Sequence, residues 1–120
     1  MTPARKALSA SLATYNYIKL LAQMPSDSYD NLHQRIVLTN FVQLLNESSN
    51  AIRDRRMETQ SRDEHSALRH SDSTVAYIIH LVRQVSIALS RGNEQEMLPN
   101  IVLALASAND ELSQMDAHVS

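Results

Sequence analysis

The sequence predicts an all-α fold, an up-down four-helix bundle built from two antiparallel helical hairpins. Apolar residues recur at spacings of three and four along most of the chain. The 120 residues include one glycine and three prolines, and most of these fall between the periodic segments. The length is that of a single domain, residues 1–120, which can bury roughly two-thirds of its unfolded surface. With no cysteine, no tryptophan and one phenylalanine, the core is expected to consist of Leu, Ile, Val, Ala and Met.

The first helix is predicted over residues 3–24. Thr2 is placed to cap it, and Pro3 stands at the first helical position, where a missing N–H has no cost. Pro25 ends the helix, because the residue before a proline is driven out of the helical region. One apolar face is expected from Leu8, Leu12, Tyr15, Ile18 and Leu21. The segment is also basic and free of acids, as transit peptides are, but we interpret it as an ordinary first helix.

The second helix is predicted over residues 29–56, after the cap-forming stretch PSDSYD. Its apolar stripe is Leu38, Phe41, Leu45, Ser48 and Ile52, and Val37, Leu44 and Ala51 widen it. After Ile52 the periodicity fails, and a polar segment, 53–70, carries charges of both signs. Because no glycine or proline interrupts this segment, the sequence leaves open whether it is a solvated helix or a linker.

The third and fourth helices are predicted over residues 73–91 and 94–116. The stretch HSDST, 70–74, has the composition of a helix stop followed by a cap. Gly92 follows the last periodic residue, where a left-handed C-terminal residue is common, and Asn93 can cap the next helix with Glu96 three residues on. So short a link predicts an antiparallel hairpin. Pro99 lies inside the fourth helix, where we expect a local bend.

Charge is distributed unevenly around a net value of −2. Residues 1–26 contain Arg5, Lys6 and Lys19 and no acid, whereas residues 93–120 contain five acids and no Lys or Arg. The first and last helices of an up-down bundle are neighbours, so their charges are expected to complement each other. The net charge argues against a nucleic-acid partner, and no apolar run predicts a membrane span. The lack of cysteine fits a cytoplasmic protein.

The residue inventory predicts no catalytic residue, no cofactor and no metal, so no enzyme. His65 and His70 are five apart, which places them on different helix faces, and Asp30-x-x-His33 has no second copy to complete a di-iron site. One glycine cannot build a phosphate-binding loop, and no serine stands in a glycine-flanked elbow. The catalytic alternative is histidine phosphotransfer, since HSALRHS, 65–71, approximates the pattern His-x-Leu-Lys-Gly of such four-helix domains and offers His65 or His70.

The function expected from this inventory is non-enzymatic protein binding, as a small adaptor, regulator or secretion chaperone that binds an amphipathic partner helix. The strict repeats of the C-terminal hairpin also allow a homodimer that completes or extends the bundle. A helical subunit of a nucleoprotein complex is the second alternative. The predicted apolar contacts are Leu98, Ile101, Leu105, Leu112 and Met115, with Arg53, Arg55 and Arg56 as a polar rim.

The C-terminal hairpin resembles the last two helices of the flagellin export chaperones. Tyr77, Arg83, Ala88, Asn93 and Leu105 stand at comparable positions in residues 76–115. The second basic residue of that family is Gln84 here, and the terminal aromatic residue is missing. The resemblance covers about a third of the chain. It implies a cytoplasmic four-helix chaperone that holds the amphipathic helix of a secretion substrate in its apolar grooves.

Overall fold

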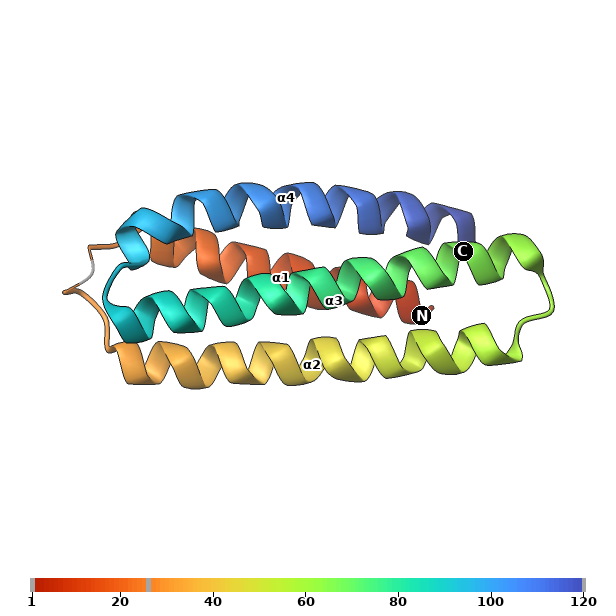
Figure 1. The fold of residues 1–120 in the computed structure, drawn as a ribbon, viewed down its shortest axis with the longest axis horizontal. Coiled ribbons are helices and arrows are strands. Elements are labelled where there is room, and N and C mark those ends of the chain that lie inside the picture. The colour runs from red at the N-terminus through yellow and green to blue at the C-terminus, as the bar shows by residue number, and fades with distance from the viewer. Residues whose placement is uncertain (1, 26, 120) are drawn as a thin grey trace.

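The computed structural model of the chain is an up-down four-helix bundle, as predicted (Figure 1). It describes residues 2–25 and 27–119, with side chains as far as Met115. The helices are α1 (Pro3–Gln23), α2 (Asn31–Glu58), α3 (Arg62–Arg91) and α4 (Glu94–Val119). Each helix packs against the next in the chain, and α4 returns to pack against α1. The molecule measures 51 × 21 × 20 Å, so all four helices run along the same long axis.

The core is the stripe that the periodicity predicts in three of the helices. In α3 the whole predicted repeat is buried, from Val75 to Leu89, and in α2 only Phe41 of the predicted stripe is partly exposed. In α1 Ile18 and Leu21 of the predicted face are buried, but the earlier part of that face is rotated, since Leu12 is 44% exposed and Leu8 and Tyr15 are half-buried. Small side chains cover the core instead, because they let α1 approach its neighbours closely. These are Ala4, Ala7, Ser11 and Thr14.

The predicted starts of α1 and α2 agree with the structure to within two residues. The Thr2 hydroxyl accepts a hydrogen bond from the Arg5 N–H at 3.2 Å, and Pro3 opens α1. The Asp30 carboxylate accepts one from the Leu32 N–H at 3.0 Å, so α2 starts at Asn31. Both caps satisfy backbone donors that the first helical turn leaves unpaired.

The polar segment 53–70 is helical on both sides of a three-residue connection at 59–61, which settles the point that the sequence left open. The predicted start of the third helix was wrong, because α3 begins at Arg62 rather than at residue 73. Its cap is Ser61, whose hydroxyl accepts a hydrogen bond from the Glu64 N–H at 3.3 Å. Ser61 and Glu64 have the spacing of a capping box, and Asp63 and Glu64 place negative charge at the positive helix end.

The stretch HSDST lies inside α3 instead of ending a helix. Ser71 and Thr74 are buried, and Thr74 donates its hydroxyl hydrogen to the His70 carbonyl one turn earlier at 3.0 Å. Asp72 accepts a hydrogen bond from Ser49 of α2 at 2.5 Å. Asp72 thus finds a partner on α2 and Thr74 one within its own helix, whereas the buried Ser71 hydroxyl has no partner among the described residues.

The tight link between α3 and α4 is built as predicted around Gly92. Its φ of 75° is left-handed, and its N–H donates to the Ala88 carbonyl. Asn93 precedes α4, and its carbonyl accepts from the Glu96 and Met97 N–H groups, but its side-chain oxygen is buried without a partner. The predicted capping box at Asn93 is therefore not formed. Pro99 lies within α4, and the first turns of that helix are offset from the rest of its axis in Figure 1.

Replacing Gly92 with alanine is expected to lower the free energy of unfolding by about 1–2 kcal/mol, the cost of a left-handed L-residue. The cause is the backbone alone, since a Cβ at this position would meet nothing within 4 Å. Chemical denaturation measures the change. Gly92→Asn is the matched control and should cost less, because asparagine tolerates this conformation. Equal stability of the alanine variant and the wild type would contradict the assigned φ.

By length and composition, α3 is apolar enough to cross a membrane, and it is the one helix in the described part of the chain that passes this test. Half of its most apolar 18-residue window is buried against the other helices. The most deeply packed helix of a helical core has the same composition, so this is weak evidence for a membrane span.

The expected pairing of basic α1 with acidic α4 does not appear as ion pairs. Among the described side chains, both ion pairs join α2 to α3. What links α1 to α4 is a buried hydrogen bond that the Ser11 hydroxyl donates to the side-chain oxygen of Asn109. Among the described side chains, any complementarity between the two helices therefore acts without direct ion pairs, at distances where salt screens it.

Candidate functional site

Four of the five apolar side chains predicted to bind a partner lie in the core. Leu98, Leu105 and Leu112 are at most 1% exposed and Ile101 is 6% exposed. They pack within the bundle because the repeat that carries them faces α1 and α3. The closed bundle therefore does not present them to a partner, and a binding role for them stays a prediction that requires α4 to separate.

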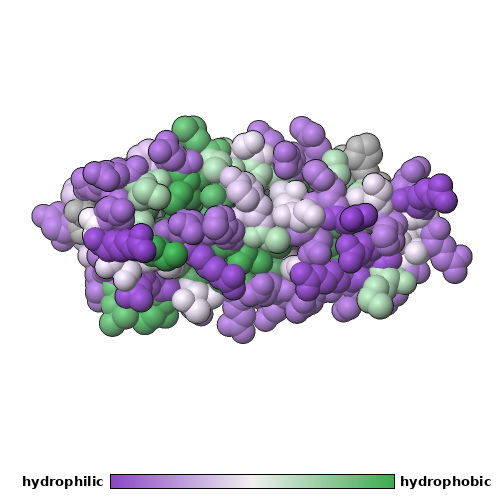
Figure 2. Space-filling model, in the orientation of Figure 1, coloured by the Kyte–Doolittle hydropathy of each residue, from purple (hydrophilic) through white to green (hydrophobic). Residues whose placement is uncertain are grey.

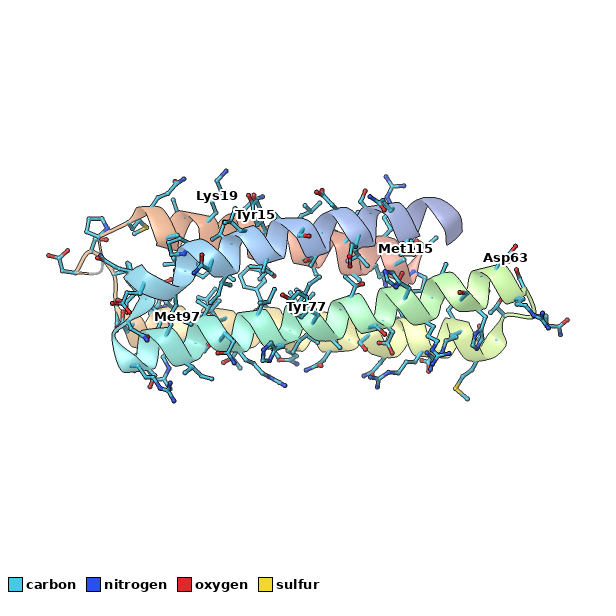
Figure 3. All side chains as sticks on the ribbon, turned by 45° about the horizontal axis from the view of Figure 1, so that its top comes forward. Tyr15, Lys19, Asp63, Tyr77, Met97 and Met115 are labelled. Carbon is cyan, nitrogen blue, oxygen red and sulfur yellow. The ribbon has the colours of Figure 1, made fainter. Side chains whose placement is uncertain are left out.

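Met115, the fifth of these residues, is half-buried at the end of the bundle where α2 connects to α3. It lines a groove of about 660 Å³ with Asp63 and His70 of α3. Figure 3 shows Met115 and Asp63 at this end, on α4 and α3. The groove brings the Met115 thioether together with charged and polar groups. No other residue that the sequence predicted to bind a partner lines it.

The three arginines predicted as a polar rim lie on α2 and mostly pair within the chain. Arg53 donates to Asp72 at 3.1 Å, and Arg55 donates to Glu64 at 2.7 Å. Both arginines are about half exposed, and Arg56 is partly buried. These contacts tie α2 to α3, so the arginines do not border the predicted apolar contacts.

His65 and His70, the candidates for phosphotransfer, are exposed on the first part of α3. His80, which was not among the predicted candidates, is exposed on the central part of the same helix. It is followed by Val82 and Arg83 at the positions of leucine and lysine in His-x-Leu-Lys-Gly, a closer match than HSALRHS. The signal was thus present in the sequence ten residues further along.

No group of three or more His, Cys, Asp or Glu side chains comes together within the described ranges in a way that could hold a metal ion.

A polar cluster of Glu94, Tyr29 and Tyr17 lies at the end of the bundle opposite the Met115 groove. Burial raises the pKa of Tyr29, and the nearby Glu94 carboxylate raises it further; burial and Tyr29 do the same to the pKa of Tyr17. Glu94 is 4% exposed, and one of its oxygens and the Tyr17 hydroxyl are buried without a partner among the described residues. Because the pKa of each tyrosine is raised, both side chains stay neutral at neutral pH. Glu94 is the one carboxylate in this cluster.

A largely apolar groove lies between α1 and α2, and we call it the α1/α2 groove. It has a volume of about 450 Å³. Its lining is Lys6, Ser9, Ala10 and Ala13 of α1 with Leu44, Glu47, Ser48 and Ala51 of α2. Of the four pairs of adjacent helices, α1 and α2 contact each other least.

The groove exists because the side chains that line its floor are small. Ala10 and Ala51 are half-buried and Ser48 is buried, whereas Leu44 stands 49% exposed at its side. Toward the α1–α2 connection the groove is closed by Tyr17 and Phe41, whose ring centroids are 5.6 Å apart. Beyond these rings, Leu20 and Ile36 are 55% and 53% exposed. The same helix pair thus exposes large apolar side chains beside a row of small ones.

Leu32 and Ile36 are exposed at the start of α2, where Figure 2 shows apolar side chains gathered at the lower left. On α1 the exposed charges are all basic, and the Lys19 ammonium lies 5.8 Å from the centre of the Tyr15 ring (Figure 3). Part of this surface could have been found in the sequence. Three residues widen the predicted stripe of α2 beyond the side chains that fill the core, and they lie on the side of α2 toward α1. These are Val37, Leu44 and Ala51.

Comparison with protein-family models, curated proteins and solved structures finds no significant match to the chain. The resemblance to the flagellin export chaperones therefore stays a prediction.

Proposed function

We propose that the protein is a non-enzymatic, cytoplasmic protein-binding module that receives a helix in the α1/α2 groove, in the manner of an adaptor, regulator or secretion chaperone. The observation that carries the proposal is the groove itself. It is about 450 Å³ in volume, has a floor of small side chains, and is bordered by the exposed Leu44, while Leu20 is exposed further along the same helix pair. A helix that inserts larger apolar side chains between α1 and α2 would bury these residues from water.

Affinity purification with a groove variant tests this proposal. Ala13→Glu places a charge at an exposed position of the groove, and Ala76→Glu makes the same change at an exposed alanine of α3. We expect the wild type and Ala76→Glu to retain a common protein, and Ala13→Glu to lose it by about tenfold or more. Circular dichroism should show all three folded, because surface substitutions change stability little.

The proposal is wrong if no protein, whether from the host or a second copy of the chain, distinguishes Ala13→Glu from Ala76→Glu. Binding that persists in both variants would place the interaction on another face of the bundle.

Histidine phosphotransfer is the second candidate function. The observation that favours it is the exposure of His80 on α3 with Arg83 three residues on. Incubation with a phosphorylated receiver domain separates the two functions. An acid-labile label that His80→Gln removes, and that His65→Gln and His70→Gln retain, would support phosphotransfer at His80.

A further inference from the structure

The α1/α2 face has two ends of different chemistry, and each end offers complementary groups on its two helices. At one end, Lys6 of α1 and Glu47 of α2 line the same groove. At the other end, Leu20 and Ile36 are both more than half exposed. Leu20 lies fourteen residues after Lys6, and Ile36 lies eleven residues before Glu47, so each pair shares one side of its helix.

The two helices are antiparallel, and the contact between Tyr17 and Phe41 fixes their register. Leu20 is about one turn beyond Tyr17, and Ile36 is a little more than one turn before Phe41, so they lie at nearly the same level. In the same register Ala13 lies level with Leu44, whereas Lys6 lies about level with Ala51, ~7.5 Å along the axis from Glu47, which lines the same groove. At two levels along the face, and across this offset between the long side chains of Lys6 and Glu47, α1 and α2 therefore carry groups that would suit each other across an interface.

We propose that the partner received by the α1/α2 face is a second copy of this chain, related by a two-fold axis that runs along the groove. Such an axis lays α1 of each copy over α2 of the other and leaves every residue at its own level. Lys6 then reaches toward the partner's Glu47 across the offset, the partner's Leu44 enters beside Ala13, and Leu20 meets the partner's Ile36. Each contact occurs twice. This inference rests on the proposed function, since it names the partner of the same surface.

Charge and size both favour a second copy over an unrelated helix. The exposed charges of α1 are basic without exception, and Glu47 stands opposite on the rim that α2 contributes. The groove is lined by small residues of α1 and larger residues of α2. The two-fold rotation therefore places the large side chains of α2 of one copy over the small side chains of α1 of the other. Two adjacent helices of this length present roughly 600 Å² to a partner, close to the ~800 Å² that each side of a standard interface buries. A closed dimer of two bundles follows, with α1 and α2 of both copies in its centre.

Charge reversal and mixing test the arrangement with the full-length chain. Sedimentation or light scattering between about 1 and 500 μM should show a wild-type dimer that dissociates on dilution. Lys6→Glu and Glu47→Lys, taken separately, are each expected to weaken this dimer about tenfold or more, since each places like charges opposite one another twice. When the two variants are mixed, the Lys6→Glu chain presents only acids at this end and the Glu47→Lys chain only bases. A heterodimer should then form with about wild-type affinity.

Arg83→Glu and Asp110→Lys are matched controls, because they reverse exposed charges on α3 and α4 and should leave dimerisation unchanged. The chain has no cysteine, so single cysteines provide a second readout. Ala13→Cys and Leu44→Cys should form a disulfide when mixed at equal concentration, and much less when either is oxidised alone.

A wild type that stays monomeric through this range, or variants whose mixture is no tighter than each alone, would overturn the dimer. If a host protein is still captured by the wild type and lost by Ala13→Glu, the dimer fails while the protein-binding function stands. If neither a host protein nor a second copy depends on the face, both fail.

Discussion

Replacing Leu105 with alanine is expected to reduce the free energy of unfolding by about 2–5 kcal/mol, a large share of the ~5–15 kcal/mol that a domain possesses. Leu105 is fully buried within the core cluster, so truncation removes apolar contacts and leaves a cavity. The bundle cannot close this cavity easily, because the helices around it hold one another at a fixed spacing. Denaturation by urea, followed by circular dichroism, measures the loss.

Leu103→Ala is the matched control. Leu103 lies two residues earlier on α4, is 70% exposed and is expected to change stability by less than about 0.5 kcal/mol. The comparison also bears on the contact set predicted from the sequence, which includes Leu105. Similar small effects of both substitutions would mean that Leu105 is accessible in solution and that α4 separates from the bundle, as partner binding by this residue requires.

Replacing Ser11 with alanine should cost about 1–3 kcal/mol, because it leaves the side-chain oxygen of Asn109 buried without a donor. Ser11 is fully buried and Asn109 is 5% exposed, so water does not readily replace the lost hydroxyl. The nitrogen of the Asn109 side chain already lacks a partner among the described residues. Further loss of hydrogen bonding therefore leaves the amide with no compensation, and thermal denaturation should detect the change.

The double variant Ser11→Ala with Asn109→Leu separates the hydrogen bond from simple packing. Replacement of both polar groups by apolar ones removes the unpaired atoms, so stability should return close to that of the wild type or exceed it. Ser107→Ala, at an exposed serine of α4, is the control and should be neutral. A Ser11→Ala variant as stable as this control would show that the buried contact contributes nothing.

The architecture could be predicted because local signals and periodicity agree along most of the chain. Thr2, Pro25 and Gly92 act locally, through a side-chain cap at Thr2 and through backbone conformation at Pro25 and Gly92. The start of α3 was misplaced because HSDST and SRDE both contain cap-forming residues. The packing of α2 against α3 decides between them, because Asp72 accepts a hydrogen bond from Ser49 of α2, while Ser61 caps α3.

The candidate site was harder to predict because periodicity identifies apolar faces without showing which neighbour covers them. The repeat of α4, including Leu98 and Ile101, is covered by the chain's own helices. Leu44 belongs to an equally regular stripe and is half exposed, because α1 contributes alanine and serine to that side of the bundle. The difference depends on the rotation of α1 about its axis. Small residues set that rotation, and they contribute little to a hydrophobic pattern.

The connection between α2 and α3 projects beyond the first turn of α1, so this tip of the molecule has fewer helices around it than the middle (Figure 1). No residue from 53 to 66 is fully buried, although the backbone there is helical on both sides of the connection at 59–61. Amide hydrogens at the tip should therefore exchange with solvent through local fraying, whereas those around Ile78 exchange only when the whole domain unfolds. The two ends of a single rod thus differ in rigidity, and a protease or a modifying enzyme could act on one without disturbing the other.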